Sequence, residues 1–277
     1  MEEIAKIVDI EKVIRLSDSG FIRNLPLFMI RVLEKIIRQD DLNEAIYTNR
    51  FKQGVPFING VLDHWNISVL VRGERNIPSK GRFVFASNHP VGALDALSFY
   101  STIYRFFPDV KSPVNQLLNH IPNLQPVTLG VNVFAMNTRE TVSRINDLFA
   151  SDDQIIIFPA GTVSRRTQGV ISDIEWQKTF ISKSIQYKRD VIPVHISGRN
   201  SNLFYIVANL RKFLRIKTAF EIILLPREMM MQLNSTFTLT FGKPISCGEL
   251  AEKYNGSNGA EMIKAIVYGL PGQTGIT

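Results

Sequence analysis

Three short apolar runs in the middle of the chain most restrict the folds open to it. They are "RFVFASNHP" over 82–90, "DQIIIFPAG" over 153–161 and "DVIPVHISG" over 190–198, and each ends in a polar loop. Hydrophobic runs without polar alternation are typical of strands buried on both faces. Amphipathic helical patterns lie between them, over 138–151 and 175–190. The alternation predicts an α/β fold with a mainly parallel central sheet flanked by helices.

Further elements follow the same pattern. Strands are expected within "NISVLVRG" over 66–73 and "QPVTLGVNVFAM" over 125–136, and a helix within "ALDALSFYSTIYRFF" over 93–107. The change to strand-like patterning near residue 66 divides the chain into an N-terminal helical segment, 1–65, and an α/β domain, 66–277.

The N-terminal segment contains "FIRNLPLFMIRVLEKIIRQDD" over 21–41, which predicts an amphipathic helix starting near Pro26. Its apolar stripe is Ile22, Leu25, Met29, Leu33 and Ile36, and most of its basic residues lie off that stripe: Arg23, Arg31, Lys35 and Arg38. Two interpretations stay open, because such a helix can pack on the protein's own core or lie on anionic lipid as an interfacial segment.

Composition excludes several classes. With 277 residues, 45% of them hydrophobic, the chain is long enough to bury a large core. The single cysteine, Cys247, excludes an intramolecular disulfide, and the four histidines show no metal-ligand spacing, so no metal and a reducing compartment are expected. The start of the chain lacks the pattern of a secretory signal, and no apolar run reaches the roughly 18 to 20 residues of a spanning helix.

The net charge of +7 favours an anionic partner, either nucleic acid or lipid. The basic residues concentrate on two strongly apolar segments, the one above and "LFYIVANLRKFLRIKTAF" over 203–220. Stretches that stack nucleic-acid bases are instead rich in glycine and aromatic residues. The distribution therefore predicts an anionic membrane surface as the partner and no nucleic acid.

The loop after the first of the three runs carries a candidate catalytic pair, His89 and Asp95. A histidine near neutrality accepts and returns a proton, and a carboxylate on one ring nitrogen fixes its tautomer. Six residues along one helix would turn the side chains about 240 degrees apart. Pro90 and Gly92 instead place His89 in a turn and Asp95 in the first helical turn, where the two can meet. The alternative is a polar turn with a helix-capping Asn88 and an ordinary surface histidine.

The loop "FPAGTVSRR" over 158–166 suits an anionic ligand. Gly161 permits a tight turn, Thr162 and Ser164 supply hydroxyls, and Arg165 and Arg166 carry planar charged groups that match a phosphate or a carboxylate. The alternative is a solvated basic turn. Because loops at the carboxyl ends of parallel strands gather at one edge of a sheet, this loop, the His89 loop and "HISGRN" are expected to converge.

Four motifs, "SNHPVGALD", "IIIFPAGT", "VIPVHISG" and "LTFGKPIS", occur in an order that resembles the glycerolipid acyltransferase family, of the lysophosphatidic acid acyltransferase type. The resemblance covers about residues 70 to 245. It implies that His89 deprotonates an acceptor hydroxyl, that Asp95 orients His89, and that the hydroxyl attacks an acyl carrier protein or coenzyme A thioester. It also implies no further cofactor, a lysolipid acceptor and a peripheral location on the cytoplasmic face of the cell membrane.

Three departures from that family pattern bear on the acceptor. Five residues instead of four separate His89 from Asp95, Ala160 replaces a glutamate, and Asn137 stands where an arginine is usual, with Arg139 nearby. The latter two fall where the family binds glycerol phosphate.

The pattern "FPAGTVSRR", followed by "DIEW" over 173–176 and "HISGRNSNLFY" over 195–205, resembles a bacterial branch often labelled hemolysins, which includes O-acyltransferases of ornithine and glycine lipids. This resemblance implies a lyso amino-acid lipid acceptor. By their chemistry, Arg165 and Arg166 can hold its carboxylate as readily as a phosphate, and Asn88, Gly161 and Thr162 are expected at its site. The alternatives are a 1-acylglycerol-3-phosphate acyltransferase and a non-catalytic, hemolysin-like lipid-surface protein.

Four other conspicuous residues are expected to be structural. His195 lies within an apolar strand pattern, Cys247 has no neighbour that marks a nucleophile, and Trp65 and Trp176 are expected to pack in the interior.

Overall fold

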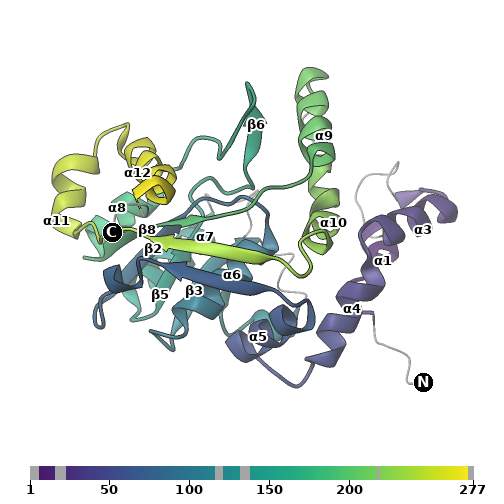
Figure 1. Cartoon of the computed structure of the whole chain (residues 1–277), viewed down its shortest axis with the longest axis horizontal. Helices are drawn as coiled ribbons and strands as arrows, with labels where there is room; N and C mark the ends of the chain where they lie inside the picture. The colour runs from purple at the N-terminus through teal and green to yellow at the C-terminus, as the bar shows by residue number, and fades with distance from the viewer. Residues whose placement is uncertain (1–5, 16–22, 116–120, 132–137, 217–218, 274–277) are drawn as a thin grey trace.

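The computed structural model describes residues 6–15, 23–115, 121–131, 138–216 and 219–273. Its centre is a seven-stranded sheet in the order β1-β9-β8-β2-β5-β3-β4, and every neighbouring pair is parallel except β8 with β9 (Figure 1). The strands are β1 (Ser68–Arg72), β2 (Phe83–Ser87), β3 (Val110–Asn115), β4 (Thr128–Val131), β5 (Gln154–Ile157), β8 (Asp190–Ile196) and β9 (Thr236–Phe241). The predicted α/β fold with a mainly parallel sheet is confirmed.

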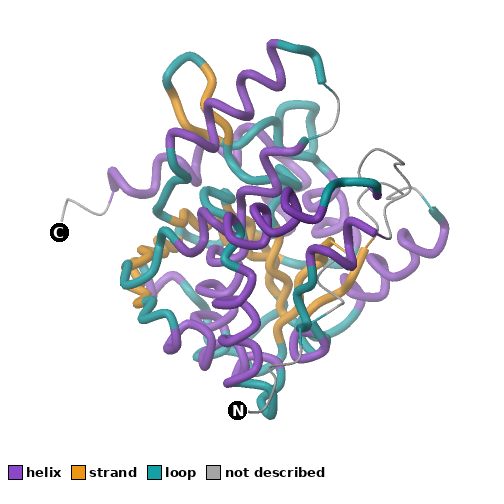
Figure 2. Tube along the Cα trace, turned by 90° about the vertical axis from the view of Figure 1, so that its right-hand side faces the viewer, coloured by secondary structure: helices purple, strands orange, loops and turns teal. Residues whose placement is uncertain are grey.

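Helices cover both faces of this sheet, and the strands lie inside them in a second view (Figure 2). The longer helices are α3 (Leu27–Ile36), α4 (Gln39–Thr48), α5 (Gly54–His64), α6 (Ala93–Ile103), α7 (Arg139–Ala150), α8 (Thr179–Gln186), α9 (Asn202–Phe213) and α12 (Gly259–Gln273). Shorter ones are α1 (Ile10–Arg15), α10 (Leu225–Met230), α11 (Cys247–Glu249) and the 3-10 turn η4 (Phe220–Leu224).

Alternate residues of β2 show how the core is divided. Phe83 and Phe85 face a cluster that contains side chains of α5, α6 and α10, whereas Val84 and Ala86 face a cluster that contains side chains of α7, α8 and α12. All four are buried. This double burial explains why the strand sequence is continuously apolar. Both tryptophans are buried as expected, Trp65 in the first cluster and Trp176 in the second.

Some strands carry too little apolar signal to be found from the sequence. β3 contains Lys111, Ser112 and Pro113, and the small antiparallel hairpin of β6 (Arg165–Thr167) and β7 (Val170–Ser172) begins with two arginines. In the predicted strand 125–136, residues 128–131 form β4 and residues 132–137, with Asn137, lie outside the described residues.

The single helix predicted over 21–41 is wrong in its extent. α3 does begin directly after Pro26, but it ends at Ile36, and Arg38 has a left-handed φ of 54° before α4 starts at Gln39. The predicted stripe is also displaced, because Ile30 is fully buried whereas 40% of Met29 is exposed. Ile22 lies outside the described residues. Packing of α3 against α1 and α4 selects the buried face.

The N-terminal segment contributes to the same core as the sheet. Leu42, Ala45 and Ile46 of α4 and several side chains of α5 belong to the cluster that includes Phe85 of β2. None of the described helices combines the length and hydropathy needed to cross a bilayer.

Candidate active site

His89 lies in the turn that joins β2 to α6, at the carboxyl edge of the sheet. Its Nδ1 is 2.9 Å from Asp95 Oδ2, and the same oxygen accepts the main-chain N–H groups of Val91 at 2.8 Å and Gly92 at 2.9 Å. Gly92, with φ of 128°, lets the chain enter α6 at Ala93 and leaves Asp95 in its first turn. The predicted meeting of the two side chains across five intervening residues is confirmed.

This geometry gives the two nitrogens of the imidazole different roles. Asp95 is fully buried, and its Oδ2 already accepts two N–H groups, so His89 Nδ1 carries the proton of that contact. The other nitrogen, Nε2, is left as the basic one, and 18% of the His89 side chain is exposed. The ring also stacks on Phe158, with centroids 4.2 Å apart. The pair can therefore act as a general base with an orienting carboxylate.

Asn88 holds the turn against the neighbouring strand. Its Nδ2 donates to the carbonyl of Ile196 at 2.9 Å, and its Oδ1 accepts the N–H of Ile196 at 2.7 Å. This side chain continues the contact of β2 with β8 beyond the last paired residue, Ser87. Asn88 is not the helix cap of the alternative interpretation, because Gly92 occupies that position.

The loop after β5 lies directly against the His89 turn. The N–H of Ser164 donates to the carbonyl of His89 at 2.7 Å, so the expected convergence of these two loops is confirmed. Gly161 has a left-handed φ of 65°, and a Cβ there would meet nothing within 4 Å. Thr162 Oγ1 accepts a hydrogen bond from Arg165 at 3.3 Å. Gly161 therefore leaves open space beside the loop, while Thr162 serves its internal structure.

Arg165 is directed into the protein. Its guanidinium contacts Glu221 Oε1 at 3.0 Å and donates to the carbonyl of Val163 at 2.6 Å, and Arg211 Nε lies 2.8 Å from the second oxygen of Glu221. Glu221 is fully buried. Burial lowers the pKa of Arg165, and the Glu221 carboxylate opposes that shift. The carboxylate of η4 thus joins the loop after β5 to α9.

Arg166 is the more accessible of the two predicted arginines. Nη1 donates to Asn202 Oδ1 at 3.1 Å, and the guanidinium lies 5.4 Å from the centroid of the Tyr205 ring. No described carboxylate forms an ion pair with it. Its charge therefore stays available to an anion at this edge of the sheet.

The sequence did not identify two residues at this site, Phe158 and Asp173. Phe158 is the first letter of the quoted "FPAGT" motif, yet its contact with the His89 ring depends on how β5 packs beside β2. Asp173 Oδ1 lies 3.2 Å from the main-chain N of His89, 84 residues away in the chain. A single acidic residue after a hairpin carries no local signal of such a contact.

The remaining candidates lie outside this constellation. His195 is on β8, where its ring is edge-on to Tyr268 with centroids 5.9 Å apart, and burial lowers its pKa. Cys247 is a half-exposed free thiol at the start of α11. Within the described ranges, no group of three or more His, Cys, Asp or Glu side chains is arranged to hold a metal ion.

Comparison with known proteins decides the family. The acyltransferase family model matches residues 12–272. The chain belongs to the acyltransferase family. It is 39% identical over 265 residues to the lyso-glycine lipid O-acyltransferase of Bacteroides thetaiotaomicron, a match that covers 95% of this chain and 97% of that protein.

A second relative, the lyso-glycine lipid O-acyltransferase of Phocaeicola vulgatus, is 36% identical with 95% of each chain covered. Among solved structures, the 1-acyl-sn-glycerophosphate acyltransferase PlsC of Thermotoga maritima matches with a TM-score of 0.49 and 14% identity, over 90% of this chain and 94% of that one. The protein described here is thus an acyltransferase whose candidate catalytic pair lies within the matched region.

Proposed function

We propose that this acyltransferase transfers a fatty acyl group from an acyl thioester to the hydroxyl of a lyso-glycine lipid at a membrane surface. The observation that carries the chemistry is the contact of His89 Nδ1 with the buried Asp95, which leaves the second ring nitrogen basic. The names of the two relatives support the acceptor, since each matches nearly the whole chain.

In the proposed reaction, His89 Nε2 takes the proton of the acceptor hydroxyl as its oxygen attacks the thioester carbonyl. Asp95 stabilises the imidazolium that forms. Collapse of the tetrahedral intermediate breaks the carbon–sulfur bond, and the imidazolium returns the proton to the leaving thiolate. An ester and a free thiol result, without a covalent acyl-enzyme. The donor thiol belongs to acyl carrier protein or to coenzyme A.

The acceptor of the proposal carries a carboxylate, for which Arg166 is the better placed arginine. Arg166 lies two residues after Ser164, whose N–H contacts the carbonyl of His89, and no described carboxylate neutralises it. Arg165 already has Glu221 as its partner, so in this proposal it holds the loop in place. Asn88 braces the His89 turn, while Gly161 and Thr162 shape the loop beside the acceptor.

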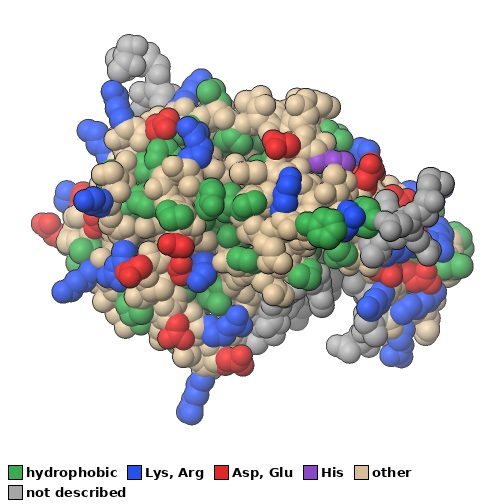
Figure 3. Space-filling view, turned by 90° about the horizontal axis from the view of Figure 1, so that it is seen from below, with side chains coloured by type: hydrophobic (Ala, Val, Ile, Leu, Met, Phe, Trp, Pro, Cys, Tyr) green, Lys and Arg blue, Asp and Glu red, His purple; other side chains and the backbone are tan. Residues whose placement is uncertain are grey.

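The face proposed to meet the membrane is formed by α9 and η4, and we refer to it as the α9 surface. It combines exposed large hydrophobic side chains from both elements: Leu203, Ile206, Leu210, Phe213, Leu214, Phe220, Ile222 and Ile223. Lys212 and Arg215 lie among them and form no ion pair with a described residue. Apolar side chains flanked by cations suit a bilayer with anionic lipids. Figure 3 shows the molecule from below, where α9 does not lie, and there basic and acidic side chains are mixed.

The first test is acyl transfer by wild type and His89→Ala, with lyso-glycine lipid, lyso-ornithine lipid and lysophosphatidic acid offered in parallel. Loss of the general base should lower the rate by a factor of about 10² to 10⁴, and mass spectrometry should identify O-acylated glycine lipid as the main wild-type product. His64→Ala, an exposed histidine at the end of α5, is the matched control and should keep full activity.

Each rival function predicts a different outcome of this assay. If lysophosphatidic acid is acylated in preference to the other two lipids, it replaces lyso-glycine lipid as the proposed acceptor. Full activity in His89→Ala would overturn the catalytic role. Lysis of lipid vesicles by wild type and His89→Ala alike, without any acylated product, would favour the non-catalytic hemolysin-like alternative.

A further inference from the structure

Asp173 is a buried carboxylate outside the candidate catalytic pair that nevertheless contacts the catalytic histidine. It follows β7 in the connection to α8, and only 3% of it is exposed. A carboxylate in such surroundings needs several hydrogen bonds to remain charged at acceptable cost. Its partners therefore indicate which parts of the molecule it holds together.

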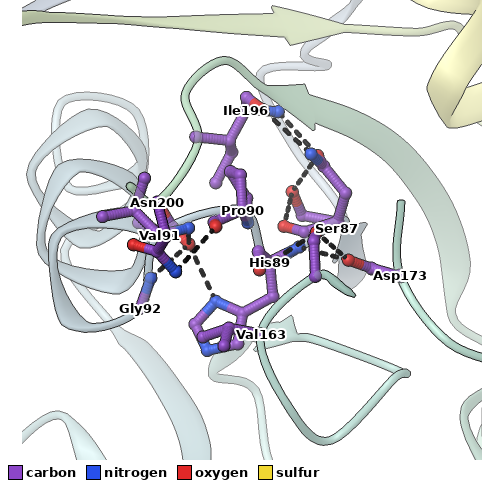
Figure 4. A network of polar contacts seen from close by, with 12 residues as sticks. Ser87, His89, Pro90, Val91, Gly92, Val163, Asp173, Ile196 and Asn200 are labelled. Atoms are coloured by element: carbon purple, nitrogen blue, oxygen red, sulfur yellow. Dashed lines mark hydrogen bonds and ion pairs between the residues drawn. The ribbon is translucent and has the colours of Figure 1, made fainter. Parts of the chain in front are cut away.

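Four hydrogen bonds surround this residue. Oδ1 accepts the Ser164 hydroxyl at 2.6 Å and the main-chain N–H of His89 at 3.2 Å. Oδ2 accepts the indole N–H of Trp176 at 2.9 Å, and the main-chain N–H of Asp173 donates to Tyr268 Oη at 2.7 Å. Figure 4 shows Asp173 approaching the His89 main chain from the side opposite to Gly92 and Val91.

Ser164 completes a clamp on His89. Its own N–H donates to the carbonyl of His89 at 2.7 Å, while its hydroxyl reaches the Asp173 carboxylate. Both main-chain polar groups of His89 are thus held by the loop between β5 and α8. Within His89, Asp95 contacts the imidazole ring and not the main chain. Two separate segments therefore position His89. Asp95 of α6 contacts its side chain, and Ser164 and Asp173, between β5 and α8, contact its main chain.

We propose that Asp173 is a positioning residue for the acyl transfer, which keeps the backbone of His89 in register with the acceptor-binding loop. This inference rests on the proposed function, because it assigns Asp173 no chemistry apart from His89.

Asp173→Asn tests the role of the charge at nearly constant volume. The amide retains one oxygen for the N–H of His89 or of Trp176, but its NH₂ group replaces the second acceptor, so two donors then face each other. Displacements of about 1 Å can cost catalysis a factor of about 10². We expect kcat to fall by about 10- to 100-fold, with KM for the lysolipid within about two-fold of wild type.

The decisive measurement repeats this substitution in the His89→Ala background. A residue that acts only by positioning His89 should have no further effect on the residual rate once the imidazole is gone. A general structural defect would lower the residual rate by the same factor as in wild type. Asp190→Asn is the matched control, because Asp190 Oδ1 accepts the N–H of Cys247 at 2.8 Å at the opposite end of β8; its kcat should equal that of wild type.

Wild-type kcat in Asp173→Asn, or equal losses in both backgrounds, would overturn the inference while His89→Ala still tests the proposed function separately. If Asp173→Asn does not fold, Ser164→Ala decides, since it removes one partner and leaves the carboxylate in place. The inference is supported if Ser164→Ala lowers kcat by less than the 10- to 100-fold expected for Asp173→Asn and has no effect on the residual rate of His89→Ala. It is overturned if Ser164→Ala leaves kcat unchanged.

Discussion

The helices α3 and α9 look alike in the sequence but differ in what they are attached to. Both combine large apolar residues with arginines and lysines. α3 packs against α1 and α4, and its buried residues are Ile30 and Glu34. α9 reaches the candidate active site through polar side chains at both of its ends. The same amphipathic pattern thus marks a peripheral helix in one region and a site-connected helix in the other.

Hydrogen bonds connect the start of α9 to its neighbours, and an ion pair connects its end. Asn202 near its start accepts from Arg166, and Ser201, which caps it, donates its hydroxyl to the buried Glu228 of α10 at 2.8 Å. Arg211 near its end shares Glu221 with Arg165. On α3, Arg31 is paired with Glu34 on the same helix at 2.8 Å. A local pair stabilises a helix, whereas a shared buried carboxylate joins separate segments.

The largest expected effect therefore belongs to Glu221. Glu221→Gln removes the charge that two arginines share, and breaking a buried ion pair typically costs about 3 to 5 kcal/mol. We expect a lower free energy of unfolding in urea titrations of the purified enzyme. Lys35→Ala on α3 is the comparison variant and should leave the unfolding midpoint nearly unchanged, since Lys35 is exposed and forms no ion pair with a described residue. Equal midpoints for wild type and Glu221→Gln would remove the contrast between the two helices.

A smaller effect is expected on lipid binding through the α9 surface. Phe213 is 81% exposed, so Phe213→Asp should leave folding intact. Removing a large apolar side chain from a lipid contact costs about 1.5 to 3 kcal/mol, which predicts at least a ten-fold weaker affinity for vesicles of phosphatidylcholine and phosphatidylglycerol. Co-sedimentation measures the affinity, and a soluble short-chain lysolipid should still be acylated at the wild-type rate.

The smallest effect is expected from the matching change on α3. Phe28 is 69% exposed, yet the Arg31 charge beside it is neutralised by Glu34. Phe28→Asp should weaken vesicle binding less than Phe213→Asp in the same assay. The reverse order would make α3, in the N-terminal segment, the principal lipid contact.

The candidate site was predictable where its signals are local. His89, Asp95 and the glycine and proline between them lie within seven consecutive positions, so turn chemistry alone places the pair. Arg165 shows the limit of that reasoning. Its partner Glu221 lies 56 residues away, and no local pattern reveals that a buried carboxylate occupies the guanidinium.

From the sequence, the strands buried on both faces, the loops that end them and the meeting of His89 with Asp95 could be predicted, because each depends on neighbours along the chain. The contacts of Asn88 with β8, of Asp173 with the His89 backbone and of Arg211 on α9 with Glu221 became visible in the folded protein alone. Those contacts join residues 108 and 84 positions apart in the first two cases. Polar partners at such separations are selected by the order and register of the strands, which local patterning does not encode.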